Sequence, residues 1–204
     1  LLSRSQIFHL EPLAESDIEY PKSEPYKLCT FSRVMKEKGI EDAINAVESV
    51  NAHFGRTVYT LDIFGQIDVE YKERFSQLEK SFPDYISYGG AIEANKSVET
   101  LKSYFALLFP TYYKGEGFAG TLIDAMSAGM PVIASDWKYN PEFVVPGKTG
   151  VIIKNCNAER LAEELINIAA APEKWNSMRL SALKESEKYK PDIAARPLID
   201  RING

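Results

Sequence analysis

The sequence predicts an α/β fold in which a Rossmann-like parallel sheet carries helices on both faces. Short apolar runs, typical of buried strands, alternate with segments in which apolar residues recur every three or four positions, as in an amphipathic helix. Gly and Pro residues separate these segments. Strands that alternate with helices favour parallel pairing, because each helical crossover returns the chain to the same end of the sheet.

The predicted elements follow one another without an internal repeat. The apolar runs predict strands over residues 26–31, 57–64, 84–88, 105–109, 132–135 and 151–154. Helices are predicted over residues 40–54, 68–81 and 97–104, from about residue 120 to Gly129, as a short turn at 141–145, and after Asn157 and Pro172. Ser97 and Asn157 are expected to cap their helices, and Gly89 with Gly90 to form a tight turn.

One domain accounts for this pattern. The chain has 204 residues, of which 45% are hydrophobic, which suffices for a single domain with a sizeable core. We place this domain at residues 26–190. Residues 1–25 contain three prolines and five acids and are predicted to be an irregular lead-in or linker, although residues 6–10 are apolar enough for a short strand. Residues 191–204 form a tail in which Pro191 and Pro197 are expected to separate short helical pieces.

Charge and cysteine content exclude several classes of function. The net charge is −5, and the sequence contains no cluster of Lys and Arg residues. Binding to nucleic acid or to an anionic membrane through charge alone is therefore not expected. Cys29 and Cys156 lack metal-ligand spacing, which argues against a metal site and fits a reducing cytoplasm. No apolar stretch in the sequence is long enough to cross a membrane.

The stretch from Lys114 to Val144 organises the chain. It follows the apolar run at 105–109, so its glycines fall in a loop that opens the next helix. A helix start offers unpaired N–H groups and a partial positive charge, and glycines allow a ligand to approach the backbone. A nucleotide phosphate is the first candidate ligand. Glu116 in the loop and Asp124 in the helix are expected to border the same pocket and to face neutral hydroxyl groups.

This stretch resembles a motif of retaining glycosyltransferases. The segment from Glu116 to Asp124, followed by Ala-Met-Ser-Ala-Gly-Met-Pro-Val-Ile-Ala-Ser-Asp and then Glu142, resembles the Glu-x7-Glu signature of family four, which has the GT-B fold. Asp124 replaces the second Glu, as in some bacterial surface-polysaccharide members. The resemblance implies that the chain is the C-terminal, donor-binding half of a two-domain enzyme, and that residues 1–25 connect it to an N-terminal domain.

The resemblance also implies roles for individual residues. Arg33 and Lys38 resemble the family's Arg-x4-Lys-Gly, with Ser32 where many members have Gly, and would stabilise a departing diphosphate without a metal. Glu116 would bind hydroxyls of the transferred sugar and Asp124 those of the ribose. Further donor-binding residues are expected in the Gly-rich loop and in the loop that offers an apolar wall to the nucleobase, namely Gly117, Phe118, Gly120, Thr121 and Ile92.

The expected function is transfer of a sugar from a UDP-, GDP- or similar nucleotide sugar to an acceptor hydroxyl, in synthesis of a surface polysaccharide or glycolipid. The acceptor, a sugar or lipid-linked glycan, would be bound by the N-terminal domain, and the full enzyme would associate peripherally with the inner face of the membrane. No metal or other cofactor is expected. A sugar-nucleotide epimerase and a nucleotide-binding module without chemistry are the alternatives. An epimerase would need an acid/base set, but the chain has no His in any loop predicted at the sheet's carboxyl edge.

Overall fold

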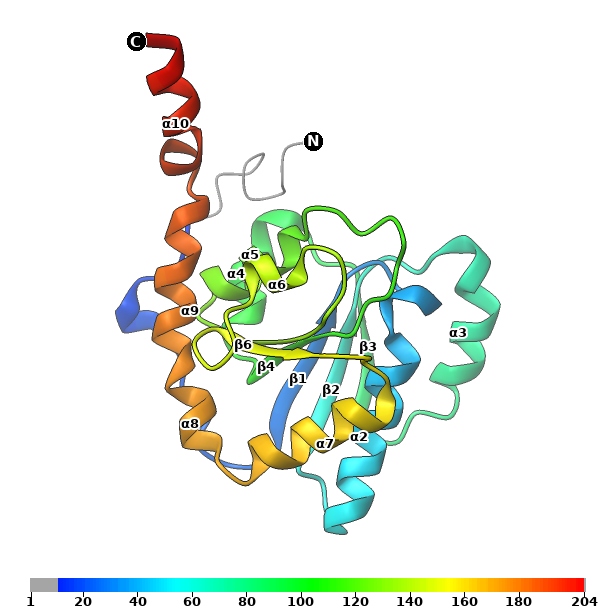
Figure 1. Ribbon diagram of the computed structural model, residues 1–204. Coiled ribbons are helices and arrows are strands. Elements are labelled where there is room, and N and C mark those ends of the chain that lie inside the picture. The colour runs from blue at the N-terminus through cyan, green and yellow to red at the C-terminus, as the bar shows by residue number, and fades with distance from the viewer. Residues whose placement is uncertain (1–10, 204) are drawn as a thin grey trace.

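A computed structural model describes residues 11–203 and shows one six-stranded parallel sheet (Figure 1). The strand order is β3-β2-β1-β4-β5-β6, so the chain starts in the middle of the sheet, builds one half and then the other. The strands are β1 (Tyr26–Phe31), β2 (Tyr59–Phe64), β3 (Ile86–Gly90), β4 (Ala106–Phe109), β5 (Val132–Ser135) and β6 (Gly150–Ile153). The strand order reverses between β1 and β4. Open α/β sheets bind ligands at such a reversal, outside the carboxyl ends of the strands.

Helices cover both faces of this sheet, as predicted. They are α2 (Ile40–Phe54), α3 (Lys72–Glu79), α4 (Ser97–Leu101), α5 (Gly120–Ser127), α6 (Asn140–Phe143), α7 (Ala158–Ala169), α8 (Pro172–Asn176), α9 (Met178–Ser186) and α10 (Pro191–Asn203). The described residues also contain five 3-10 turns: η1 (Glu15–Asp17), η2 (Lys36–Lys38), η3 (Val69–Tyr71), η4 (Ala94–Lys96) and η5 (Glu187–Tyr189).

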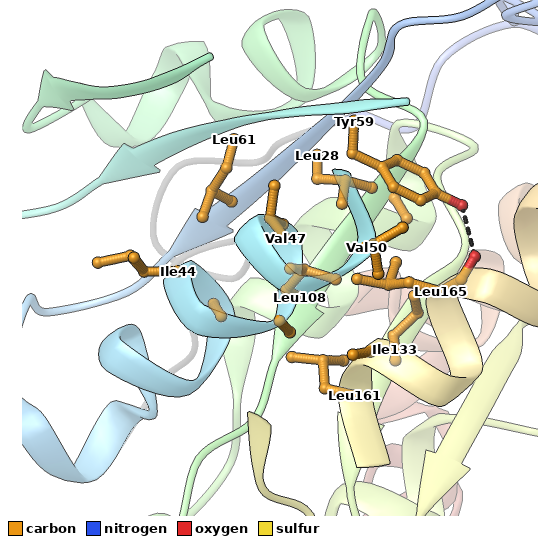
Figure 2. Packing of buried hydrophobic residues seen from close by; sticks show 14 of the residues in the cluster. Leu28, Ile44, Val47, Val50, Tyr59, Leu61, Leu108, Ile133, Leu161 and Leu165 are labelled. Carbon is orange, nitrogen blue, oxygen red and sulfur yellow. Dashed lines mark hydrogen bonds between the residues drawn. The ribbon is translucent and has the colours of Figure 1, made fainter. Parts of the chain in front are cut away.

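On one face, α2 and α7 pack side by side against the sheet (Figure 2). Apolar residues at helical spacing on α2, such as Val47 and Val50, meet Leu161 and Leu165 of α7 over the central strands. The Tyr59 hydroxyl lies within this core and donates a hydrogen bond of 2.9 Å to the Leu165 carbonyl. A buried polar group is thereby satisfied instead of destabilising the core.

The second face is closed by α4, α5 and α9. A buried cation joins α9 to the sheet: Arg179 is 0% exposed, and its guanidinium donates to the carbonyls of Tyr104 and Lys102, both at 3.0 Å, and of Phe105 at 3.3 Å. Burial lowers the pKa of Arg179 to about 10, so the group stays charged at neutral pH. Because these carbonyls lie at the entry to β4, α9 is part of the domain core.

Several predicted boundaries are corrected by the structure. Gly89 and Gly90 do not form a separate turn but end β3, because Gly90 pairs with Phe64 of the neighbouring strand. Ser97 does not cap α4; it lies within the helix, and its hydroxyl donates to the Ala94 carbonyl. Asn157 does cap α7, accepting the backbone N–H of Arg160.

The two ends of the described chain differ from each other. Residues 11–25 are irregular apart from η1, as predicted, and run along the domain: the Leu13 N–H donates to the Ser127 carbonyl, and Ile18 is buried. The short strand predicted at 6–10 lies outside the described residues. Helix α10 continues through position 197, so the prediction that a proline breaks the tail there is wrong. In Figure 1, α10 extends away from the sheet beyond α9.

Candidate functional site

A cavity of about 670 Å³ lies at the carboxyl edge of the sheet, where the strand order reverses. It is lined by the ends of β1, β2 and β4, by the loops that follow β1, β2, β3 and β4, and by the start of α5. The lining includes Phe31, Ser32, Arg33, Met35, Lys38, Phe64, Gly65, Gln66, Ala91, Ile92, Phe109, Tyr113, Gly115, Glu116, Gly117, Phe118, Ala119, Gly120 and Thr121. A second cavity, of about 420 Å³, is lined by β6 and α7 and contains none of the predicted site residues.

The loop after β1 and the loop after β4 are fastened to each other. Gly39 ends η2 in a left-handed conformation, with a φ of 72°, and packs directly on Pro110. The Glu37 carbonyl accepts the backbone N–H of Tyr112 at 2.8 Å. These contacts bring the residue before Gly39, which is Lys38, beside the Gly-rich loop.

Lys38 and Glu116 form an ion pair in the cavity wall. Lys38 Nζ lies 2.6 Å from Glu116 Oε2, and the two side chains are only 12% and 9% exposed. The ammonium also lies 5.6 Å from the ring centre of Phe109 and 5.3 Å from that of Tyr113, within the range of cation-π contacts. The pair is therefore shielded from water in a way that surface ion pairs are not.

Arg33 supplies a second cation at the cavity. Its side chain is 60% exposed, and Nη1 lies 3.5 Å from Asp68 Oδ2 in the loop after β2. Asp68 also accepts the backbone N–H of Glu70. An exposed and loosely paired guanidinium can turn toward an anion in the cavity at little cost.

The start of α5 forms another part of the cavity wall. The Thr121 hydroxyl donates to the Phe31 carbonyl at 2.8 Å, which joins the helix start to the end of β1. The Gly120 N–H donates to the Phe118 carbonyl, whereas the Thr121 N–H lies in the first turn, where a helix provides no internal acceptor. The backbone N–H of Thr121 is thus better placed than that of Gly120 to donate a hydrogen bond to an anion.

Phe118 belongs both to the cavity and to an aromatic cluster beside it. Its ring is 51% exposed and meets Phe143 of α6 edge-on, at a centroid distance of 5.1 Å. Tyr189, the last residue of η5, lies 6.4 Å from Phe118 and 5.6 Å from Phe143. The Gly-rich loop is therefore packed against the segment that leads into α10.

The structure brings most of the predicted site residues together. Eight of them line the cavity: Arg33, Lys38, Ile92, Glu116, Gly117, Phe118, Gly120 and Thr121. Asp124 differs, because it lies further along α5, is 1% exposed and is not among the lining residues. The expectation that it borders the pocket is not met in this conformation.

Thr111 was not predicted from the sequence. Its hydroxyl donates to Glu116 Oε2 at 2.8 Å, from only five residues away. A Thr directly after the proline that ends a strand, and shortly before a loop acid, is the one signal that could have indicated it.

The described residues contain no group of three or more acidic, His or Cys side chains placed to bind a metal ion. Among the same residues, none of the helices is both long and apolar enough to cross a membrane. The charged side chains in the lining of the cavity are Arg33, Lys38 and Glu116.

Known proteins are similar to this chain in sequence and in fold. The family model described as glycosyl transferases group 1 matches residues 14–185. A Streptococcus gordonii protein, the UDP-N-acetylglucosamine--peptide N-acetylglucosaminyltransferase GtfA subunit, is 33% identical over 67% of this chain, and the match covers 26% of that protein. The chain thus spans about a quarter of the length of this relative.

Two solved structures show the same fold. The Anabaena protein Alr3699/HepE in complex with UDP superimposes on 96% of this chain with a TM-score of 0.77, at 15% identity, and the match covers 55% of that chain. The C-terminal domain of a group 1 glycosyl transferase, LpcC from Francisella tularensis, superimposes on 94% of this chain with a TM-score of 0.70, at 18% identity, and is covered over its whole length. With the family match over most of its residues, the chain belongs to the group 1 glycosyl transferases.

Proposed function

We propose that this chain is the donor-binding part of a retaining glycosyltransferase, which transfers a sugar from a nucleoside-diphosphate sugar to an acceptor hydroxyl. The observation that carries the proposal is the ion pair of Lys38 and Glu116 in the wall of a cavity that also contains Arg33 and the start of α5. One cavity thus offers cations for a diphosphate and a carboxylate for sugar hydroxyls.

The cations suit a leaving diphosphate. When the bond to the anomeric carbon breaks, negative charge builds up on the diphosphate, and fixed cations stabilise that charge more strongly than the ground state. Arg33 is exposed enough to turn toward it. Lys38 donates to Glu116 but has three N–H groups, so it can bind a phosphate oxygen without leaving the carboxylate. The Thr121 amide provides a further donor at the helix start. In this proposal the diphosphate needs no divalent metal.

The remaining contacts are assigned to the sugar and the nucleoside. Glu116 accepts a hydrogen bond from the transferred sugar, and Gly117 and Phe118 shape the wall beside it. Ile92, which lines the cavity, packs against the nucleobase. Asp124 is assigned to the ribose hydroxyls by the family resemblance. Because it is 1% exposed, this contact requires Asp124 to become accessible when the donor binds.

The names of the relatives fit a nucleotide-sugar donor with either base, since two of them are named as GDP-mannose-dependent mannosyltransferases. The Streptococcus gordonii relative is named for UDP-N-acetylglucosamine, and the Anabaena structure contains UDP. The acceptor, a sugar or glycan, is bound outside this chain, and the full enzyme acts in the cytoplasm at the inner face of the membrane. Since holding both reactants in place can contribute roughly 7–11 kcal/mol to lowering a barrier, the isolated chain should bind donor but transfer no sugar at an enzymatic rate.

Calorimetry tests the binding part of the proposal. The chain is titrated with UDP, GDP, UDP-glucose, UDP-N-acetylglucosamine and GDP-mannose, first with EDTA and then with Mn²⁺. We expect at least one nucleoside diphosphate to bind equally well under both conditions. Binding that EDTA abolishes and Mn²⁺ restores would contradict a metal-free site, and no binding of any nucleotide would contradict the proposed function.

Release of nucleoside diphosphate in the presence of acceptor tests the catalytic part. The isolated chain is compared with a fusion to the N-terminal domain of a family member. Transfer by the fusion alone is expected. Rapid transfer by the isolated chain would show that this domain contains its own acceptor site.

A further inference from the structure

Two donors converge on one oxygen of Glu116. Lys38 Nζ lies 2.6 Å and Thr111 Oγ1 lies 2.8 Å from Oε2. The other oxygen, Oε1, has no hydrogen-bond partner among the described residues. The Glu116 side chain is 9% exposed and lines the cavity. One face of the carboxylate is thus fixed by the protein, and one oxygen is left for a ligand.

We propose that Thr111 is a positioning residue for the sugar donor: with Lys38 it holds Glu116 Oε2, so that Oε1 recognises a single hydroxyl of the transferred sugar. This inference rests on the proposed function and makes it more specific. It assigns a role to a residue outside the predicted motifs, and it limits Glu116 to one hydroxyl instead of a vicinal pair.

Thr111 is built to keep its hydroxyl in one orientation. The residue is 0% exposed, and its carbonyl accepts a hydrogen bond of 2.6 Å from the Ser135 hydroxyl. Its own hydroxyl accepts the Tyr113 N–H at 3.2 Å. The single hydroxyl hydrogen has two acceptors in reach, the Glu116 carboxylate at 2.8 Å and the Glu37 carbonyl at 3.3 Å. The carboxylate is the nearer and the charged one, so it takes the hydrogen.

Lys38 alone would not fix the carboxylate. An ammonium is a point charge on a flexible stem and attracts both oxygens of a carboxylate almost equally. Lys38 would also share its hydrogen bonds with a bound diphosphate, so it would hold the carboxylate less firmly once the donor is present. The Thr111 hydroxyl is neutral and lies on a buried backbone, so it is neither flexible nor attracted to a diphosphate. Thr111 therefore keeps Oε2 in place while Lys38 donates some of its hydrogen bonds to the phosphates. The orientation of Glu116 thereby becomes independent of the donor's charge.

The test compares Thr111→Val with Thr111→Ser. Valine keeps the shape and removes the hydroxyl, whereas serine keeps the hydroxyl. Calorimetry uses whichever of UDP-glucose, UDP-N-acetylglucosamine and GDP-mannose binds the wild-type chain most tightly, together with its parent UDP or GDP. The measured quantity is the dissociation constant of the diphosphate divided by that of the nucleotide sugar. This ratio isolates the contribution of the sugar, which a merely structural role of Thr111 would not change.

We expect Thr111→Val to lower this ratio about tenfold, as for loss of a charged hydrogen bond, while the affinity for the diphosphate changes less than about twofold. Thr111→Ser should restore the ratio, and Glu116→Gln should lower it as Thr111→Val does. Among nucleotide sugars that each lack one sugar hydroxyl, a single analogue should bind Thr111→Val and wild type alike.

Three results would overturn the inference. Glu116→Gln lowering the ratio while Thr111→Val leaves it unchanged would show that Glu116 acts without Thr111. Equal weakening of sugar and diphosphate by Thr111→Val would assign Thr111 to folding alone. Absence of all nucleotide binding by the wild type would remove the proposed function, and this inference with it. If circular dichroism shows Thr111→Val to be unfolded, Thr111→Cys replaces it, because a thiol of similar size is a weak donor and should also lower the ratio.

Discussion

Gly39 approaches Pro110 so closely that a Cβ atom on the glycine would lie 2.3 Å from the Pro110 carbonyl oxygen. Glycine is required at this position for two reasons: the close contact with Pro110, and a φ of 72°, which is unfavourable for residues with a side chain. This contact holds η2, and with it Lys38, against the loop that contains Glu116.

Gly39→Ala should therefore destabilise the domain more than an ordinary left-handed glycine would. Gly147 is a matched control, since its φ is 75° and nothing lies within 4 Å of a Cβ built there. We expect about 1–2 kcal/mol for Gly147→Ala, the cost of the backbone conformation, and at least about 1 kcal/mol more for Gly39→Ala. Urea unfolding measures both. Equal losses would mean that Pro110 moves aside freely.

Arg33→Ala should weaken binding of a nucleoside diphosphate by about 1.5–3 kcal/mol, the range for loss of a charged hydrogen bond. Arg56 is a suitable control, because it is similarly exposed, at 55%, and pairs with Glu24 outside the cavity lining. Calorimetry of both variants with UDP separates a specific contact from a change in net charge. An unaltered affinity in a folded Arg33→Ala variant would remove Arg33 from the site.

Asp124→Asn should weaken UDP while leaving 2′-deoxy-UDP nearly unaffected, if Asp124 accepts hydrogen bonds from the ribose diol. Each nucleotide serves as the control for the other within one variant. Equal losses for the two nucleotides would agree with the burial of this side chain and would assign Asp124 to the packing of α5.

Arg179→Met should cost about 3 kcal/mol or more, because three carbonyls lose their donor in the interior. Arg160, which is 62% exposed and paired with Glu163, should lose less than about 1 kcal/mol on the same change. The pKa of Arg179 is lowered to about 10, so the cost of burying its charge is constant below that pH and is relieved only as the pH rises through it. The difference between wild type and Arg179→Met should therefore stay the same from about pH 6 to pH 9. A strong pH dependence in this range would contradict a permanently charged Arg179.

Glu185→Gln should behave in the opposite way. Hydrogen bonding from Lys188, aided by the charge of Lys148, lowers the pKa of Glu185 below its ordinary 4.5 despite burial. A carboxylate whose pKa is depressed in the folded state stabilises that state above the unfolded pKa, and this stabilisation is lost as the pH falls through the folded pKa. The variant should thus be less stable than wild type at pH 7 and approach it below about pH 4. Thermal unfolding at several pH values measures this gap, and a gap that persists in acid would exclude the ionised carboxylate as its cause.

The central strands were the most predictable part of the fold. The strands over 26–31 and 132–135 have the predicted bounds, because most of their residues are apolar and all of them except Lys27 are buried. At the sheet's edge, strand pairing outweighed the local preference of the sequence. The Gly89-Gly90 pair by itself indicates a turn, but pairing with β2 keeps it in a strand. Ser97 likewise has a capping side chain but lies within a helix, because η4 leads directly into α4.

The sequence motifs predicted which residues form the site, but they did not predict the contacts between those residues that depend on the fold. The sequence places Lys38 and Glu116 in two loops, but their contact depends on Gly39 packing against Pro110, which has no local signature. The role of Thr111 depends in the same way on Ser135, a residue of another strand. Asp124 shows the converse, since the motif indicates a ligand contact where the structure buries the side chain.

The ring of Phe118 lines the donor cavity on one side and touches Tyr189 on the other, immediately before the residues that lead into α10. A displacement of α10 that moves Tyr189 must break this ring contact, and a donor that shifts Phe118 must do the same from the cavity side. By thermodynamic reciprocity, any free energy that couples donor binding to the position of α10 through this contact acts equally in both directions.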